Sequence, residues 1–288
     1  MHGHLRSVAT ASDGQGPPAQ IYYSRKITNV DAQAGSVTFA DGTSKQGDLI
    51  IGADGVHSIA RKQIDPHIEA KPGHHSAFRF LVSEKEVLED PRCASFFSTR
   101  NHQMLWYAKD RKVVMYRCEN NDLLNFVCIH PGHMSSAVHD SYNAVADKSL
   151  VLDIFHDFEP GLLAIFEKAN PKSLRVYPLF DMGPLPTFVK GKMALLGDAA
   201  HPFLPHLAQG GAMAIEDGVS LGVMMSELTS LDDIPARLKL YNEARYERDM
   251  TIQRYTRIVG GDGVKDEQKS GEELSCKWQS ALAHRITD

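Results

Sequence analysis

The stretch LLGDAAHPFLPHLAQGGAMAIEDG, residues 195–218, decides how the rest of this chain of 288 residues is interpreted. It begins within KMALLG, a short apolar run that predicts a buried strand delivering Asp198 to the edge of a sheet. A loop stiffened by two prolines follows the acid. The pair Gly210-Gly211 then leads into a long apolar run, which predicts a helix over residues 211–229.

A strand, an acid, a loop and a helix in this order can hold a ligand. An acid at the carboxyl end of a strand can accept hydrogen bonds from ribose or ribityl hydroxyls. Gly210 and Gly211 have no Cβ, so a flat ring can approach their backbone closely. The positive end of the following helix favours negative charge, such as that of a reduced flavin. We therefore expect a cofactor in front of Asp198.

A second motif, DLIIGADGVHSIARKQI, occupies residues 48–64. Its apolar run predicts a buried strand, Asp54-Gly55 predicts a turn, and Ser58–Ile64 can begin a helix. Asp54 and Arg61 are separated by two helical turns, so both can face the carboxyl edge of the strand. For the dipeptide alone, an Asp-Gly turn that caps a helix is the alternative. The string G-A-D-G-x-x-S-x-x-R as a whole is much more specific.

The remaining hydrophobic patterns place a strand-rich block between the two motifs. A hairpin is expected from residues 27–30 and 36–39. Further strands are expected at residues 76–82, 104–107, 112–117, 123–129 and 175–180, and helices over 149–168, in two parts, and 236–258.

The composition narrows the class of protein. The net charge is −5 with both signs interspersed, which is unlike a nucleic-acid-binding surface. The four cysteines are too few for a disulfide framework, and no stretch reaches the ~20 apolar residues of a membrane span. The fourteen histidines show no metal-ligand spacing, so no metal site is expected. We expect a soluble, cytoplasmic protein.

Together, the two motifs resemble those of the flavin-dependent aromatic hydroxylases, or group A FAD monooxygenases, and especially their salicylate-hydroxylase-like branch. The resemblance runs from about residue 4 to about residue 258 and includes FRFLVSEKEVLEDP and KVVMYRCENNDLLNFVCIHP. It implies that FAD and NAD(P)H are the cofactors. The residues that it assigns to cofactor binding are Asp54, Gly55, Arg61, Gly197, Asp198, Pro205, Gly210 and Gly211.

The resemblance also implies an activity: hydroxylation of a phenolic or aromatic acid-type substrate by O₂ through a C4a-hydroperoxyflavin. For catalysis we expect Arg79 and Tyr116, because a guanidinium can hold a carboxylate or phenolate and a tyrosine hydroxyl can bond the ring oxygen. In SAFRFLV, Arg79 alternates with the phenylalanines and therefore shares the opposite face. Tyr107 competes with Tyr116 for its role. The alternative is that Arg79 forms a surface ion pair and Tyr116 lies in the core.

The family normally opens with a strand, a G-x-G-x-x-G turn and a helix that hold the FAD pyrophosphate. GQGPPA at residues 14–19 is a poor match, because no apolar strand precedes it and two prolines interrupt it. HGHLR at residues 2–6 lies where the family has an arginine before a D-L-H-like string. We therefore expect an incomplete, truncated FAD-binding domain.

The expected fold class is α/β, or mixed α+β, in which an FAD/NAD(P)-binding domain contains an inserted antiparallel-sheet substrate domain. The expected parts are residues 1–70, the first part of the FAD-binding domain; 71–178, the substrate-binding sheet domain; 179–260, the second part with its helices; and 261–288, a loose tail. Two other functions stay open: an inactive, FAD-free remnant of this fold, and a related flavoprotein epoxidase or reductase.

Overall fold

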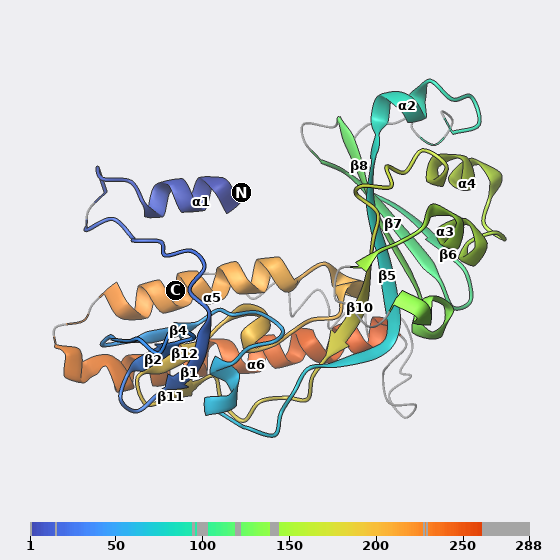
Figure 1. Cartoon of the computed structure of the whole chain (residues 1–288). Helices are drawn as coiled ribbons and strands as arrows, with labels where there is room; N and C mark the ends of the chain where they lie inside the picture. Colours follow the sequence, from blue (N-terminus) through green and yellow to red (C-terminus); the bar gives the residue numbers. More distant parts are fainter. Residues whose placement is uncertain are drawn as a thin grey trace.

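The computed structural model describes residues 2–14, 16–93, 96, 103–118, 122–138, 144–226, 228 and 230–260. Within these residues two hydrophobic cores form, one beside a six-stranded sheet and one around a small mixed sheet and two long helices (Figure 1). We call these two parts the sheet lobe and the helical lobe. The mixed helix and sheet content confirms the predicted fold class.

The helical lobe begins with a three-stranded antiparallel sheet made of β1 (Ile27–Asp31), β2 (Ser36–Phe39) and β3 (Ser44–Gln46). The carboxylate of Asp31 accepts hydrogen bonds from the backbone of the β1–β2 turn. Gly35 in that turn has φ +73°, a conformation that favours glycine. The predicted hairpin is therefore confirmed.

A second sheet joins the two motif strands. Its strands are β11 (Val189–Lys190), β12 (Met193–Leu195) and β4 (Ile50–Gly52), in that order. β12 pairs with β4 in parallel. The expectation that β4 is buried was wrong in part, because Ile51 is 50% exposed. Within the described residues β4 lies at an edge of the sheet, so part of the strand faces outward.

Two long helices lie side by side in the helical lobe (Figure 1). They are α5 (Gly210–Ser226) and α6 (Ile234–Gly260), which confirms both predicted helices. The two glycines form the first turn of α5 rather than preceding it. Ser230 forms a capping box with Asp233 just before α6, which fixes where this helix begins.

The sheet lobe is built from strands at the five predicted positions and one further short strand, β9, that was not predicted. They are β5 (Lys71–Ser83), β6 (Met104–Tyr107), β7 (Lys112–Cys118), β8 (Leu123–Pro131), β9 (Ala144–Val145) and β10 (Arg175–Asp181). They pair antiparallel in the order β6-β7-β8-β5-β10-β9. The lobe also contains the short helices α2 (Glu84–Leu88), α3 (Lys148–Ile154) and α4 (Pro160–Phe166).

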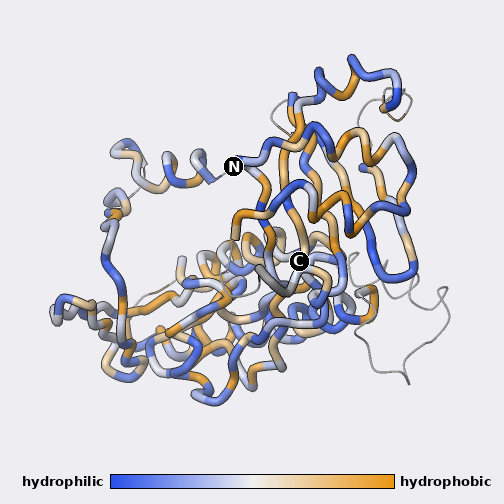
Figure 2. Tube along the Cα trace, turned by 45° about the vertical axis from the view of Figure 1, so that its right-hand side comes forward, coloured by the Kyte–Doolittle hydropathy of each residue, from blue (hydrophilic) through white to orange (hydrophobic). Residues whose placement is uncertain are grey.

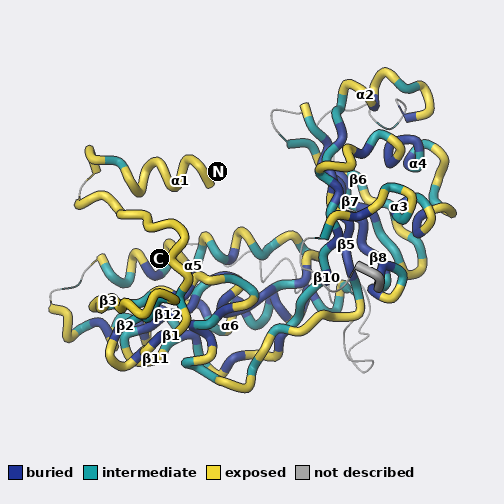
Figure 3. The backbone as a smooth tube through the Cα atoms, viewed as in Figure 1, coloured by how far each residue is buried: buried dark blue, intermediate teal, exposed yellow. Residues whose placement is uncertain are grey.

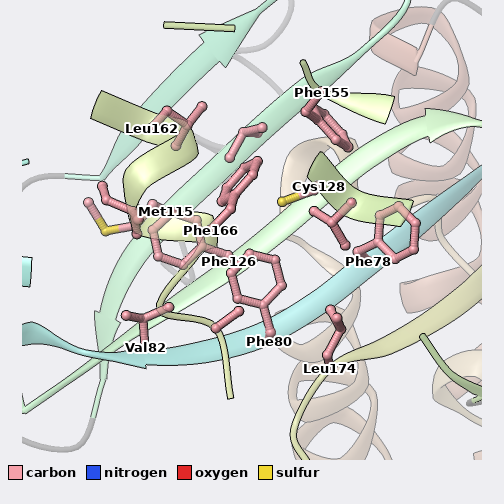
Figure 4. Close-up of a cluster of buried hydrophobic side chains, with 14 of the residues drawn as sticks. Phe78, Phe80, Val82, Met115, Phe126, Cys128, Phe155, Leu162, Phe166 and Leu174 are labelled. Atoms are coloured by element: carbon pink, nitrogen blue, oxygen red, sulfur yellow. The ribbon is translucent and has the colours of Figure 1, made fainter. Parts of the chain in front are cut away.

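Hydrophobic and hydrophilic residues both occur along the strands of this sheet (Figure 2), and successive side chains of a strand point to opposite faces. The face covered by α3 and α4 carries an aromatic core (Figure 4). Phe80 stacks on Phe126 with ring centroids 5.2 Å apart, and both rings meet Phe166 edge-on. We call the opposite side the open face; it carries Arg79, Leu105, Tyr107, Lys112 and Tyr116.

Helix α1 (His2–Ala9) buries none of its residues and lies apart from both lobes (Figures 1 and 3). The predicted loose tail, residues 261–288, lies outside the described residues. Across the part of the chain that is described, no helix is long and apolar enough to cross a membrane.

Candidate functional site

The two motif strands end side by side, which brings Asp54 and Asp198 to one edge of the small sheet. Leu195 of β12 lies opposite Gly52 of β4 in a parallel pair. A Cβ at Gly52 would lie 2.6 Å from the side chain of Leu195, so this close approach requires glycine. The carboxyl ends of such strands are where α/β proteins bind ligands.

Asp54 caps the turn that follows it. Its carboxylate accepts hydrogen bonds from the hydroxyl of Ser58 at 2.5 Å and from the backbone N–H groups of Ile59 at 2.7 Å and Ala60 at 3.1 Å. The turn continues as one turn of 3-10 helix rather than a longer helix. Gly55 has φ +77°, which favours glycine there. Contact of Asp54 with a cofactor stays a prediction.

Arg61 joins the two motifs. It is 2% exposed, and its guanidinium donates to the carbonyls of Gly55 at 3.3 Å and Val56 at 2.9 Å. It also donates to the carbonyls of Asp198 at 2.6 Å and Ala199 at 2.7 Å. Burial lowers the pKa of this guanidinium, and nearby carboxylates oppose that shift. Because its guanidinium donates to backbone carbonyls of both motifs, Arg61 positions both motif turns.

The carboxylate of Asp198 has no hydrogen-bond partner among the described residues, and the residue is exposed. Desolvation by the surrounding protein raises its pKa, whereas the charges of His201 and Arg61 lower it. The preceding Gly197 has φ +58°, and its N–H donates to Asp217 at 2.9 Å. This turn therefore presents an acceptor with free lone pairs at the strand ends.

The loop after Asp198 leads to an accessible helix N-terminus. Pro205 begins a short 3-10 turn, Pro205–Leu207, and Gly210 and Gly211 start α5. A Cβ at Gly211 would meet no atom within 4 Å, and one at Gly210 would come no closer than 3.7 Å to Phe203. The backbone N–H groups of this first turn can therefore be approached by a ligand.

A buried network of charged side chains holds the two ends of the turn at Gly197 and His201. His201 Nε2 lies 2.7 Å from Asp217 Oδ2, and Arg245 donates to Asp217 at 2.8 Å and to Asp249 at 2.7 Å. His201, Asp217 and Asp249 are fully buried. Because Asp217 also binds the N–H of Gly197, the network fixes the turn that carries the exposed acid.

Burial also changes the proton affinities in this network. It raises the pKa of Asp249 to about 7, although the charges of His201 and Arg245 oppose the shift. Burial alone would lower the pKa of His201, but its hydrogen bond to Asp217 and the two carboxylate charges raise it overall. Both groups therefore hold protons more strongly than usual.

The same three residues have ligand atoms within 4.8 Å of one another, as a metal site requires. Arg245 already donates to Asp217 and Asp249, so a cation would have to displace it. The absence of a metal site stays a prediction. Sequence patterns did not predict this network, although the i,i+4 spacing of Arg245 and Asp249 was a local signal for an ion pair.

The structure places both residues expected for catalysis on the open face. Arg79 donates to the side chain of Asn125 at 3.2 Å and has no ion pair within the described residues. Tyr116 on β7 lies opposite Asn125 on β8. It is 38% exposed, so it does not lie in the core. Tyr107 on β6 shares this face and is 70% exposed. The roles of these residues stay predictions.

Comparison with known proteins identifies the family. Residues 15–256 match the family described as FAD binding domain. The chain belongs to this FAD-binding family. Among its relatives, the FAD-dependent monooxygenase cfoG of Aspergillus candidus is 36% identical over 261 residues, which are 88% of this chain and 59% of the relative. Hispidin-3-hydroxylase of Neonothopanus nambi is 31% identical over 264 residues, 86% of this chain and 61% of that enzyme.

Among solved structures, a substrate complex of salicylate hydroxylase has a TM-score of 0.73 and 24% identity, covering 93% of this chain and 68% of that one. This likeness shows the fold. The relatives' names confirm the resemblance to FAD-dependent monooxygenases at the level of the family. The chain spans about three fifths of the length of these curated relatives.

The described residues around Asp198 fit the ribityl and ring parts of the FAD of this family. Asp198 offers an unpaired carboxylate suited to hydroxyl groups, and Gly211 leaves open space at the start of a helix of 17 residues. Arg61 and the buried network hold these elements without using the Asp198 carboxylate. An acceptor of this kind suits the ribityl hydroxyls of a flavin, and the positive end of α5 suits the negative charge of its reduced ring.

Proposed function

We propose that this protein is an FAD- and NAD(P)H-dependent monooxygenase that hydroxylates a phenolic or aromatic acid-type substrate with O₂. The observation that carries the proposal is the unpaired carboxylate of Asp198 beside the accessible first turn of α5. The names of the relatives support it, because they include FAD-dependent monooxygenases and a hispidin hydroxylase.

In this proposal the cofactor residues divide into three groups. Asp198 accepts hydrogen bonds from the ribityl chain, and Gly210 and Gly211 let the flavin ring approach the positive end of α5. Asp54 and Arg61 hold the turns that face it. Pro205 and the glycines Gly55 and Gly197 shape those turns. When bound and reduced by NAD(P)H, FAD supplies the activation of O₂.

The sheet lobe supplies the substrate residues. We assign residues 71–178 to a substrate domain inserted between two parts of the FAD-binding domain, residues 1–70 and 179–260. On its open face, Arg79 binds a carboxylate or phenolate and Tyr116 bonds the ring oxygen. By stabilising negative charge, Arg79 favours the ionised form of a phenol, and the ring carbon of a phenolate attacks an electrophilic oxygen atom more readily than that of the neutral phenol.

An epoxidase or reductase on the same scaffold is the alternative within the family, and a flavin-free remnant is the alternative outside it. Hydroxylation is favoured over epoxidation or reduction by the name of the Neonothopanus relative, which is a hydroxylase. Hydroxylation is favoured over a flavin-free remnant because the carboxylate of Asp198 is exposed and unpaired among the described residues, as a ligand-binding acid must be.

The test is to titrate the purified protein with FAD by fluorescence and then to measure NAD(P)H oxidation with a panel of phenolic acids. We expect saturable FAD binding, substrate-stimulated NAD(P)H oxidation, and incorporation of one atom of isotopically labelled O₂ into the product. The same FAD titration is made with the variant Asp198→Asn. Its matched control is Asp153→Asn, because Asp153 is an exposed acid in the sheet lobe. Absence of FAD binding and of NAD(P)H oxidation in the intact protein would refute the proposal.

A further inference from the structure

The chain crosses between the two lobes through one pair of strands (Figure 1). It enters the sheet lobe at the start of β5 and leaves it at the end of β10, where Lys71 lies opposite Asp181. The hydrogen-bond ladder of this strand pair is incomplete, because Pro72 and Pro178 have no N–H and the register shifts between Pro178 and Phe180. The backbone of this junction therefore fixes the angle of the sheet lobe only weakly.

Pockets beside the junction leave the strand pair incompletely packed. Their volumes are about 360 and 190 Å³, and Gly73 and Asp181 line both of them. The smaller pocket reaches Leu204 in the loop before α5. Close packing is what makes a protein interior stiff, and part of the strand pair lacks it. The two strands can therefore bend unless another contact holds them.

Arg257 holds the junction from the helical lobe. It lies near the end of α6, beside β10 in Figure 1, and its guanidinium donates to both carboxylate oxygens of Asp181, at 2.7 and 2.8 Å. It also donates to the carbonyl of the next residue, Met182. A bidentate contact of this kind fixes direction as well as distance. One side chain of the helical lobe therefore sets how β10 leaves the sheet lobe.

The same face of α6 also holds the loop before α5. Gln253 donates to the carbonyl of Pro202 at 3.1 Å, and a Cβ at Gly260 would lie 2.5 Å from the ring of His206. Gln253, Arg257 and Gly260 are spaced by four and three residues, so they lie on one face of the helix. The end of α6 therefore connects the junction strand to the loop in front of the proposed cofactor site.

The open face of the sheet meets this loop close to the junction. The rings of His75 on β5 and His206 lie edge-on with their centroids 6.3 Å apart. Arg79 lies four residues further along β5 on the same face as His75. From Lys71 at the junction to Arg79 is about 26 Å of strand. A rotation of about 4° at the junction therefore moves Arg79 by about 2 Å, and a misplacement of about 1 Å can already cost ~10²-fold in rate.

We propose that Arg257 is a positioning residue. Through Asp181 it sets the angle of the sheet lobe, and with it the distance between the open face and the loop before α5. Arg257 acts through the junction strand and needs no contact with substrate or cofactor. Its effect on lobe geometry is independent of the proposed function, whereas its effect on catalysis rests on that function. The alternative is that the ion pair only stabilises the fold.

The experiment measures the distance between the lobes by pulsed electron paramagnetic resonance of two spin labels on the full, flavin-free chain. The labels are attached at Lys109→Cys, in the turn after β6, and at Lys239→Cys on α6, because both lysines are exposed. The native Cys118 and Cys276 are first replaced with serine, because the other two cysteines are buried and can stay.

The variants Arg257→Met and Asp181→Ala each remove one end of the contact. The matched control is Arg248→Met, because Arg248 lies on the same helix and its side chain is 24% exposed, like that of Arg257. Arg248 also forms a bidentate contact, at 2.7 and 2.9 Å, but with Glu216 of the helical lobe. Thermal melts establish that each variant is folded. If Arg257→Met does not fold, Arg257→Lys replaces it, because lysine keeps the charge and loses the two-bond geometry.

We expect the distribution of distances to shift or widen by at least about 2 Å in both junction variants, as the length of the strand implies, and to stay unchanged in Arg248→Met. In the protein loaded with FAD, Arg257→Met should lower the share of oxidised NAD(P)H that yields hydroxylated product by at least about 10-fold, with FAD affinity unchanged. Unchanged lobe distances in both junction variants would overturn the proposal, even if both variants lose stability.

The two proposals fail in different ways. If the lobe distances respond to Arg257→Met but FAD does not bind, the positioning of the lobe stands and the monooxygenase proposal fails. If FAD binds and the wild-type protein hydroxylates its substrate, but the lobe distances do not respond, the positioning proposal fails alone.

Discussion

Replacing Arg61 with methionine tests whether the two motifs are held together by one side chain. Methionine keeps much of the buried volume but removes all four hydrogen bonds to the carbonyls of Gly55, Val56, Asp198 and Ala199. Bonds from a charged donor each contribute more than neutral ones, but desolvation of the guanidinium offsets part of the sum. We expect the free energy of unfolding to fall by about 3–5 kcal/mol, because buried carbonyls lose their partners.

The assay is urea unfolding followed by circular dichroism, on the flavin-free chain so that cofactor contacts cannot contribute. Arg25→Met is the matched control, because Arg25 forms an exposed pair with Asp41 and such pairs contribute little. If Arg61→Met were no more destabilising than Arg25→Met, the positioning role would be wrong. A cofactor contact would then be the better explanation of Arg61.

Three further predictions follow from the site. Asp198→Ala should weaken FAD retention without lowering the melting temperature of the flavin-free chain; a loss of stability with unchanged flavin content would show that the acid only caps its loop. Arg79→Ala and Tyr116→Phe should each slow hydroxylation by ~10²-fold with flavin binding intact, and unchanged turnover in both would remove them from the mechanism. Because burial raises the pKa of Asp249 to about 7, the native state binds the extra proton, and stability should fall as pH rises from 5 to 7, by at most ~1.4 kcal/mol per pH unit. Asp249→Asn should flatten that slope in pH-dependent urea unfolding, and equal slopes in the two proteins would contradict this assignment.

Local patterns in the sequence predicted the elements well. The alternation in SAFRFLV placed Phe78 and Phe80 on the covered face and Arg79 on the other, because side chains of a strand alternate. The positions of the two motif strands followed from short apolar runs. Their pairing, by contrast, depends on the register between Gly52 and Leu195, which no local pattern encodes.

The parts that sequence reasoning missed depend on contacts between distant segments. The guanidinium of Arg61 donates to carbonyls of both motifs, and this link was not predicted. Every residue carries a backbone carbonyl, so the identity of the accepting residue gives no signal for such a bond. Contact of Arg61 with a cofactor stays a prediction. His201 and His206 lie in one loop, yet one is paired with Asp217 and the other has no hydrogen-bond partner in the described residues. Neither environment can be read from the loop sequence.

The parallel pairing of β4 with β12 has a consequence for the order of folding. Arg61 and Ala199 are 138 residues apart along the chain, and the whole sheet lobe lies between them. Closing so long a loop has an entropic cost, whereas most strands of the sheet lobe pair with near neighbours in sequence. During synthesis the first motif therefore emerges long before its partner strand exists, and its apolar residues stay without their native contacts until β12 arrives. Pulsed hydrogen exchange should detect this order as late protection of the amides in β4 compared with those in β8.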